Sequence, residues 1–203
     1  MHKHKSEDKK ILKLSYFTVV YNVIEGLVSV LLGSHINAIS LIGFGFDSFI
    51  ESLSGGVVIW KTRKGATNAH DDPIEVKAIR LISYTFFILA AYVLYQSVQK
   101  LVSHQVPEQS WFGIVIALIS IVVMFVLYLE KRQIGLSTHN RALIADSKQT
   151  LACIWMSIVL LAGLGLNHFF GFWWSDALGG IVISVLLFKE GLETYQLKHL
   201  CDC

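Results

Sequence analysis

The sequence predicts an all-α, polytopic membrane protein with six transmembrane helices. Three observations carry this prediction: 54% of the 203 residues are hydrophobic, only 16% are charged, and the apolar residues fall into long separate runs. Soluble domains average about 25% charged residues, and an apolar run of about 20 residues crosses a bilayer as a helix. The net charge of +2 is too small to indicate a nucleic-acid partner.

The apolar runs follow one another with short polar connectors. We expect a membrane domain over residues 12–190, between an N-terminal tail (1–11) and a C-terminal tail (191–203). Its helices are expected at Leu12–Gly33, Ile39–Trp60, Val76–Leu101, Trp111–Leu129, Ala142–Leu166 and Phe172–Phe188. Pro73 followed by Glu75 is typical of a helix start, and the charged run Glu130-Lys131-Arg132 marks the expected end of the fourth span.

Lysine and arginine occupy alternate connectors, and this predicts the orientation. They occur in the N-terminal tail and in the second-to-third and fourth-to-fifth connectors, and scarcely in the others. Because positive residues favour the cytoplasmic side, we expect both termini in the cytoplasm and the protein in the cell (inner) membrane. Trp111, Trp173 and Trp174 are then expected at the opposite interface. Three cysteines are too few for a disulfide framework.

The second expected span carries two acids, Asp47 and Glu51, one helical turn apart on the same face. Each charge costs about 2.5–3.5 kcal/mol in the middle of a bilayer. No lysine or arginine lies in the middle of an expected span to pair with them. A divalent cation held between helices explains why both acids are present. The alternative is a buried pair that is neutralised by protonation.

A second polar stripe lies on the fifth expected span, with Asp146, Gln149 and Cys153 one turn apart. If the two stripes face each other, four potential ligands meet: Asp47, Glu51, Gln149 and Cys153. That number suits tetrahedral Zn²⁺, and carboxylate with thiolate also accepts Cd²⁺, Co²⁺ or Fe²⁺. The alternatives are a small buried residue for Cys153 and an interhelical hydrogen bond for Gln149.

Other polar residues have two interpretations each. Glu25 and Asn22 on the first span are accessory ligands or a proton relay, or else a hydrogen-bonded helix contact. Asp146 lines an access path, as a further proton relay or accessory ligand, or else fixes backbone near the helix start. Asp176 is expected to cap the sixth helix. The connector between the second and third spans carries a candidate metal site made of His70, Asp71 and Asp72. The alternative is a polar connector that binds nothing.

These motifs resemble the cation diffusion facilitator (cation efflux) family over residues 12–198. Asp47-x-x-x-Glu51 is similar to the family's Asp-x-x-x-Asp pair, and Ala145-Asp146 matches its dipeptide on helix five. The family's following His and Asp fall on Gln149 and Cys153. Trp174-Ser-Asp176 opening helix six is also similar to the family.

The resemblance implies export of a divalent transition-metal ion, Zn²⁺ above all, from the cytoplasm. It further implies proton-coupled alternating access, a homodimer, no enzymatic activity and no organic cofactor. Gln149 cannot titrate, so the family's His is not reproduced. The sequence continues only about fifteen residues past helix six, so we expect a variant without the family's soluble C-terminal domain. The rival interpretation is a metal-binding membrane sensor or regulatory partner that does not transport.

Overall fold

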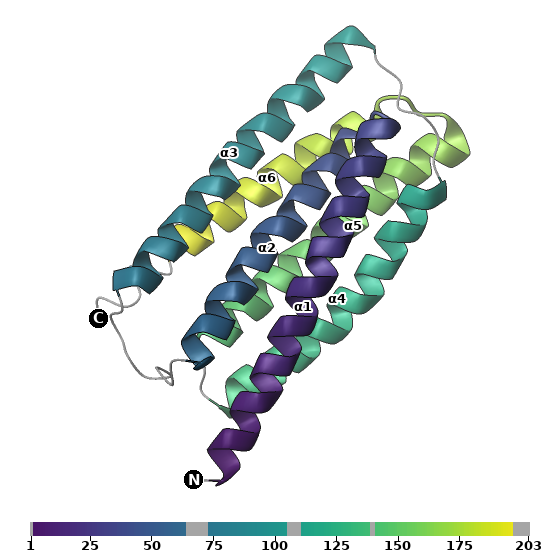
Figure 1. Cartoon of the computed structure of the whole chain (residues 1–203). Coiled ribbons are helices and arrows are strands. Elements are labelled where there is room, and N and C mark those ends of the chain that lie inside the picture. The colour runs from purple at the N-terminus through teal and green to yellow at the C-terminus, as the bar shows by residue number, and fades with distance from the viewer. Residues whose placement is uncertain (1, 64–72, 105–110, 139–140, 197–203) are drawn as a thin grey trace.

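The computed structural model describes residues 2–63, 73–104, 111–138 and 141–196, which form six helices and no strand. The helices are α1 (His2–His35), α2 (Ile39–Arg63), α3 (Pro73–Ser103), α4 (Trp111–Ser137), α5 (Arg141–Phe170) and α6 (Ser175–Gln196), as Figure 1 shows. The predicted all-α class is confirmed.

The predicted helix starts agree with the structure better than the predicted ends. α2 and α4 begin at Ile39 and Trp111 as expected, and α3 begins at Pro73. α1 starts earlier, at His2, and α4 continues past the charged run to Ser137. The reason is that Glu, Lys and Arg are good helix formers, so charge ends an apolar run without ending the helix.

Five of the six helices are long and apolar enough to cross a membrane: α1 to α5. α6 carries Asp176 near its start and three charged residues near its end: Lys189, Glu190 and Glu193. Its 22 residues still span about 33 Å at the usual rise of 1.5 Å per residue, which matches the apolar thickness of a bilayer.

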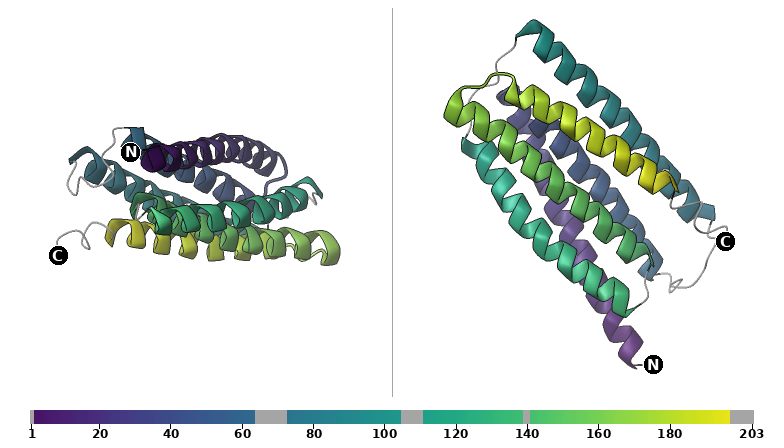
Figure 2. Two further views of the ribbon diagram at one scale, coloured as in Figure 1. Left: turned by 90° about the horizontal axis from the view of Figure 1, so that it is seen from below. Right: turned by 180° about the vertical axis from the view of Figure 1, so that it is seen from behind.

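The helices form a four-helix bundle with a helix pair against it. α1 packs mainly on α2 and α4 mainly on α5, and contacts of α2 with α5 and of α1 with α4 close the bundle. α3 and α6 pack on each other and lie against α2 and α5 (Figure 2). The first turn of α1 and the last turn of α6 lie at the same end (Figure 1), as an even number of crossings requires.

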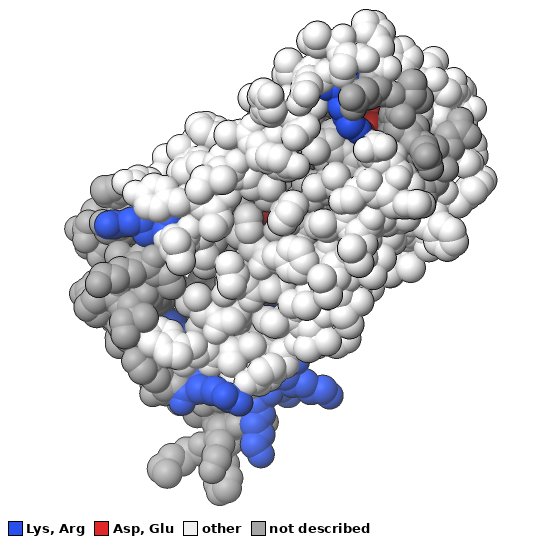
Figure 3. Space-filling model, turned by 45° about the horizontal axis from the view of Figure 1, so that its top comes forward, with Lys and Arg blue, Asp and Glu red and all other residues white. Residues whose placement is uncertain are grey.

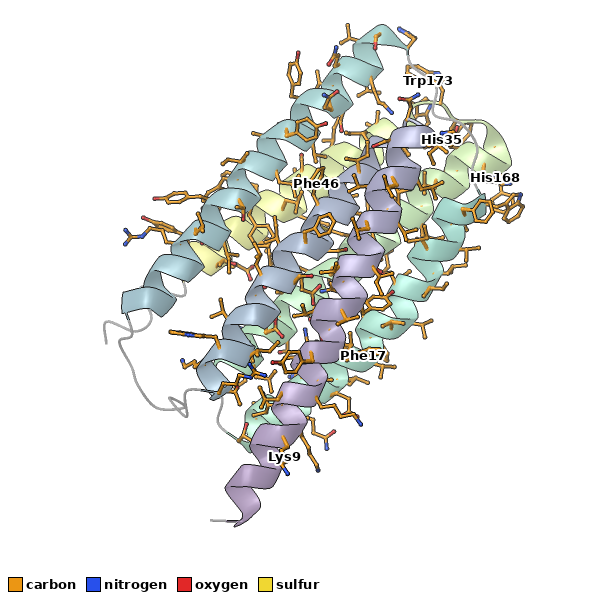
Figure 4. All side chains as sticks on the ribbon, in the orientation of Figure 1. Lys9, Phe17, His35, Phe46, His168 and Trp173 are labelled. Atoms are coloured by element: carbon orange, nitrogen blue, oxygen red, sulfur yellow. The ribbon has the colours of Figure 1, made fainter. Side chains whose placement is uncertain are left out.

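The outside of the bundle is apolar along its length. Large side chains such as Phe17, Ile88 and Val122 are more than half exposed, and Phe17 and Phe46 project outward in Figure 4. Figure 3 shows a long flank almost without charge, with most of its lysines and arginines at the end that holds the N-terminal part of α1. An apolar surface of this extent belongs in lipid rather than in water.

Two glycines let α1 and α2 approach each other closely. A Cβ atom added at Gly26 would lie 2.9 Å from the backbone oxygen of Gly45. A Cβ atom at Gly45 would lie 2.9 Å from Cβ of Ser29 and 3.0 Å from the oxygen of Gly26. Small residues at such crossings are typical of helix packing in membranes. The contact brings the polar residues of α1 against those of α2.

Asp176 has a different role from the expected one. Its carboxylate accepts hydrogen bonds from the backbone nitrogens of Ile39, at 3.0 Å, and Ser40, at 3.3 Å. Lys100 of α3 lies 3.5 Å from the same carboxylate. The described contacts of Asp176 therefore cap the start of α2 and tie three helices together at the end opposite the termini.

Candidate metal site

The two acids of α2 point into the bundle, away from the lipid-facing surface. Asp47 is 1% exposed and Glu51 is not exposed at all. Oδ1 of Asp47 and Oε2 of Glu51 are buried and have no hydrogen-bond partner among the described residues. Since a buried carboxylate oxygen without a donor is costly, these two atoms are suited to receive a ligand that brings positive charge.

The polar stripe of α5 faces these acids. The thiol of Cys153, which is fully buried, lies close to the carboxyl group of Asp47. One turn earlier, Oγ1 of Thr150 donates to Oε1 of Glu51 at 2.5 Å. Gln149 is also buried, and its Nε2 has no partner among the described residues. Thr150 is a site residue that the sequence analysis did not single out.

A buried lysine pairs with the site, which corrects the prediction that no basic residue does. Lys131 of α4 is fully buried, with Nζ 3.3 Å from Oε1 of Glu51 and 2.9 Å from Oδ2 of Asp146. Nζ also donates to Oγ1 of Thr150 at 2.7 Å. Asp146 thus serves as a counter-ion for Lys131 in this arrangement. Within the described part of the chain, Asp47 has no basic partner of this kind.

The sequence does contain a signal for Lys131. The buried residues of α4 recur every three or four positions, which is the period of one helix face. They are Gly113, Ile114, Ala117, Ser120, Met124, Leu127, Lys131 and Gly135. Lys131 is in phase with this buried stripe, whereas its neighbours Glu130 and Arg132 are exposed. By hydropathy alone, the charged run indicates the end of the span, and only the phase of its middle residue with the buried stripe places Lys131 inside the bundle.

The four candidate ligands do not all converge in this arrangement. Cys153 lies close to Asp47, whereas Glu51 is held by Lys131 and Thr150. Consistent with this, the described residues contain no group of three or more His, Cys, Asp or Glu side chains placed to hold a metal ion. A metal site formed by both acids therefore requires Glu51 to move relative to Lys131.

Helix α1 adds a second acid network beside α2. Oε1 of Glu25 accepts a hydrogen bond from the Tyr21 hydroxyl at 2.8 Å, and Oε2 accepts one from Ser48 at 3.0 Å. Both carboxylate oxygens of Glu25 are thus occupied. Asn22, by contrast, is fully buried with neither side-chain atom partnered among the described residues.

The level of Asn22 in the bundle follows from its neighbours on α1. Glu25 bonds to Ser48, and the oxygen of Val19 accepts a weak bond of 3.5 Å from Ser52. Asn22 lies between these two contacts, so it is level with the segment of α2 that carries Asp47 and Glu51. The predicted loop site at His70, Asp71 and Asp72 lies outside the described residues.

Comparison with known proteins identifies the family of this architecture. A family model described as the cation efflux transmembrane domain matches residues 15–195, which is nearly the whole described bundle. The chain belongs to the cation efflux family. The matched region includes α2 with both acids and α5 with Asp146, Gln149 and Cys153.

Two curated relatives share the membrane region at low identity. A protein of Methanocaldococcus jannaschii named as an uncharacterized transporter is 25% identical over 191 residues, which are 91% of this chain and 67% of the relative. Transmembrane protein 163 of Xenopus laevis is 22% identical over 193 residues, which are 95% of this chain and 68% of the relative. Members of the cation efflux family transport cations across membranes, and membership of this family implies divalent metal ions as substrates.

Proposed function

We propose that this protein exports a divalent transition-metal ion, Zn²⁺ before Cd²⁺, Co²⁺ or Fe²⁺, from the cytoplasm by proton-coupled alternating access. The observation that carries the proposal is the buried pair Asp47 and Glu51, each with a carboxylate oxygen that lacks a donor among the described residues. The membership of the chain in a cation-transporting family supports it. As the resemblance implies, we propose a homodimer as the working unit.

The proposed ligands combine hard and soft donors. Asp47 and Glu51 supply carboxylate oxygens, Cys153 supplies a thiolate, and Gln149 completes or lines the shell. A thiolate beside carboxylates suits Zn²⁺ and Cd²⁺, and suits Mg²⁺ or Ca²⁺ poorly. The proximity of Asp47 and Cys153 supports this set, because the two side chains come from different helices and lie close together.

Proton exchange follows from the chemistry of the ligands. Carboxylates and thiols must lose their protons to bind a metal ion, so metal release and protonation are linked. In the proposed cycle, the deprotonated acids take the ion from the cytoplasmic side and the helices then rearrange toward the opposite side. Protons replace the metal there. Glu25, which is bonded to Ser48 next to Asp47, is the proposed relay, with Asn22 as an accessory polar group.

Metal flux into proteoliposomes tests the proposal. Vesicles that enclose a zinc-sensitive dye should show uptake with the wild-type protein and no uptake above empty vesicles with Glu51→Gln, because the variant loses a charged ligand. The control is Glu130→Gln, which neutralises an exposed acid about two turns before the end of α4 and should leave uptake unchanged. Equal uptake by wild type and Glu51→Gln would reject the proposed route.

One observation favours a sensor that binds metal without transporting it. Glu51 is held by a buried ammonium group, and the described residues contain no assembled three-ligand site. Zinc binding that depends on Glu51, without flux in the same vesicles, would establish the sensor in place of the transporter.

A further inference from the structure

A fully buried ammonium group lies against one of the two proposed metal-binding acids. Nζ of Lys131 is shared among Oδ2 of Asp146, Oε1 of Glu51 and Oγ1 of Thr150, at 2.9, 3.3 and 2.7 Å. These partners come from α5 and α2, while the lysine comes from α4. The only oxygen of Glu51 without a partner among the described residues is Oε2.

The ammonium group of Lys131 and a metal ion both bind best to a negatively charged oxygen from which water is excluded. The carboxylate of Glu51 offers such oxygens to either of them. Within the bundle, water cannot screen the attraction, so the ion pair between Lys131 and Glu51 is stronger than one at a surface. A metal ion that draws charge from Glu51 therefore weakens the bond of this acid to Lys131. Asp146, the nearer of the two carboxylates, is in place to keep the ammonium paired.

We propose that Lys131 is an internal competitor for the transported cation: its ammonium group holds Glu51 until a divalent metal ion displaces it, and returns when the ion leaves. Lys131 is a positioning residue in this scheme and does not touch the metal. The inference rests on the proposed function, because it requires that Glu51 binds the ion.

The charges of the surrounding groups agree with this role. With the proposed ligands deprotonated, the carboxylates of Asp47, Glu51 and Asp146 and the thiolate of Cys153 carry four negative charges, and the ammonium of Lys131 reduces the sum to three. A divalent cation reduces it to one, whereas a monovalent ion leaves two uncompensated buried charges, which is more costly. Lys131 also favours release of the metal ion, because its ammonium group can pair with Glu51 as the ion leaves.

Zinc affinity of lysine variants tests the competition. Purified full-length Lys131→Met should bind Zn²⁺ about tenfold more tightly or better than wild type, since Glu51 no longer has a competing cation. Its transport should show a lower half-saturating zinc concentration and a lower maximal rate, because release becomes slower. Lys148→Met, which removes an exposed lysine beside Gln149, is the matched control and should leave both values unchanged.

Two further variants separate competition from a purely structural or bulk-charge effect. Lys131→Met combined with Asp146→Asn restores the net charge of the wild type, yet should still bind zinc more tightly than wild type. Asp146→Asn alone leaves Glu51 as the only acid for the lysine and should weaken zinc binding. If the doubly substituted protein binds zinc no more tightly than wild type, the competition is rejected.

Variants that keep a positive charge make the test independent of folding. Lys131→Arg preserves the buried pair, and a guanidinium group binds carboxylates with two parallel bonds, so zinc affinity should fall. If neutral variants fail to assemble, unchanged affinity in both Lys131→Arg and Asp146→Asn rejects the inference. Zinc binding by wild type that Glu51→Gln abolishes must be seen first. Without it the proposed function fails, whereas with it a failure in the lysine variants rejects this inference alone.

Discussion

The thiol of Cys153 and the carboxyl group of Asp47 lie together in a fully buried position. They come from different helices, so their proximity depends on the packing of α2 against α5. A thiolate is a soft ligand and a carboxylate a hard one, and this pair biases a site toward Zn²⁺ and Cd²⁺. Under the proposed function, the choice of metal therefore depends on one side chain, Cys153.

Substitution Cys153→Ser should change metal preference more than it changes folding. A serine has almost the same size but offers a hard oxygen, so Cd²⁺ affinity should fall about tenfold relative to Mn²⁺ affinity. Competition binding of the two ions to purified protein measures the ratio. An unchanged ratio would remove Cys153 from the ligand set, and Cys153→Ala tests whether any loss reflects the missing donor alone.

At the scale of single residues, the acids Asp47 and Glu51 were predictable from the sequence, whereas the partners of Glu51, Lys131 and Thr150, were not. Asp47 and Glu51 stand out because acids are rare in apolar runs and because they share a helix face. Lys131 was missed because a charged run at the end of an apolar segment usually lies at the membrane surface, and only the phase of the buried stripe on α4 places this residue inside. That Thr150 and Lys131 meet at Glu51 depends on three helices packing together, which no single segment encodes.

Helix α2 is the central element of the bundle, since it contacts α1, α3, α5 and α6. Its start is capped by Asp176 from α6, and its middle approaches α1 through Gly26 and Gly45. These contacts fix where the acids lie relative to α1 and α5. The account therefore predicts that the site is sensitive to changes in the packing of α2 even far from the acids.

A methyl group at Gly45 should disturb the α1–α2 contact. Gly45→Ala places a Cβ atom 2.8 Å from Val30 and 3.0 Å from the backbone oxygen of Gly26, which cannot move aside without shifting α1. Overpacking of this kind costs about 1–3 kcal/mol, so the melting temperature in detergent and the zinc flux should both fall. Gly56→Ala on the same helix is the control, because a Cβ atom there meets nothing within 4 Å. Equal melting of the two variants would contradict the packing argument.

Helix starts were predictable because apolar runs and a proline mark them, as at Ile39, Trp111 and Pro73. The helix ends, and the contacts that the helices make with one another, were less predictable. The extension of α4 to Ser137 adds polar turns that carry no hydropathy signal, and the capping of α2 by Asp176 is a contact between residues 137 positions apart. Long-range contacts of this kind follow from how the helices assemble, which local patterns leave open.

On the scale of the whole molecule, the bundle has two different ends. Lys9 lies at the end that holds both terminal helix ends, whereas His35, His168 and Trp173 lie at the other (Figure 4). The aromatic residues at this second end include Trp111, which packs on His168, and Trp173, which stacks on His104. Positive residues at one end and aromatic residues at the other support the predicted orientation with cytoplasmic termini.

Labelling of single cysteines tests this orientation. In a variant whose native cysteines are replaced by serine, His104→Cys should react with a membrane-impermeant maleimide in intact spheroplasts. Lys9→Cys should react only after the membrane is broken, because the account places it in the cytoplasm. The reverse pattern would mean that the bundle is inserted the other way round, and that the proposed direction of transport is wrong.

The central claim is that Asp47 and Glu51 are present inside the bundle because a divalent cation binds between them. Equilibrium dialysis against Zn²⁺ tests it most directly, with protein in which the tail residues Cys201 and Cys203 are serine so that they cannot contribute thiolates. The account predicts that this protein retains zinc in stoichiometric amount, and that adding Asp47→Asn and Glu51→Gln abolishes retention. Equal zinc in both proteins would contradict the account.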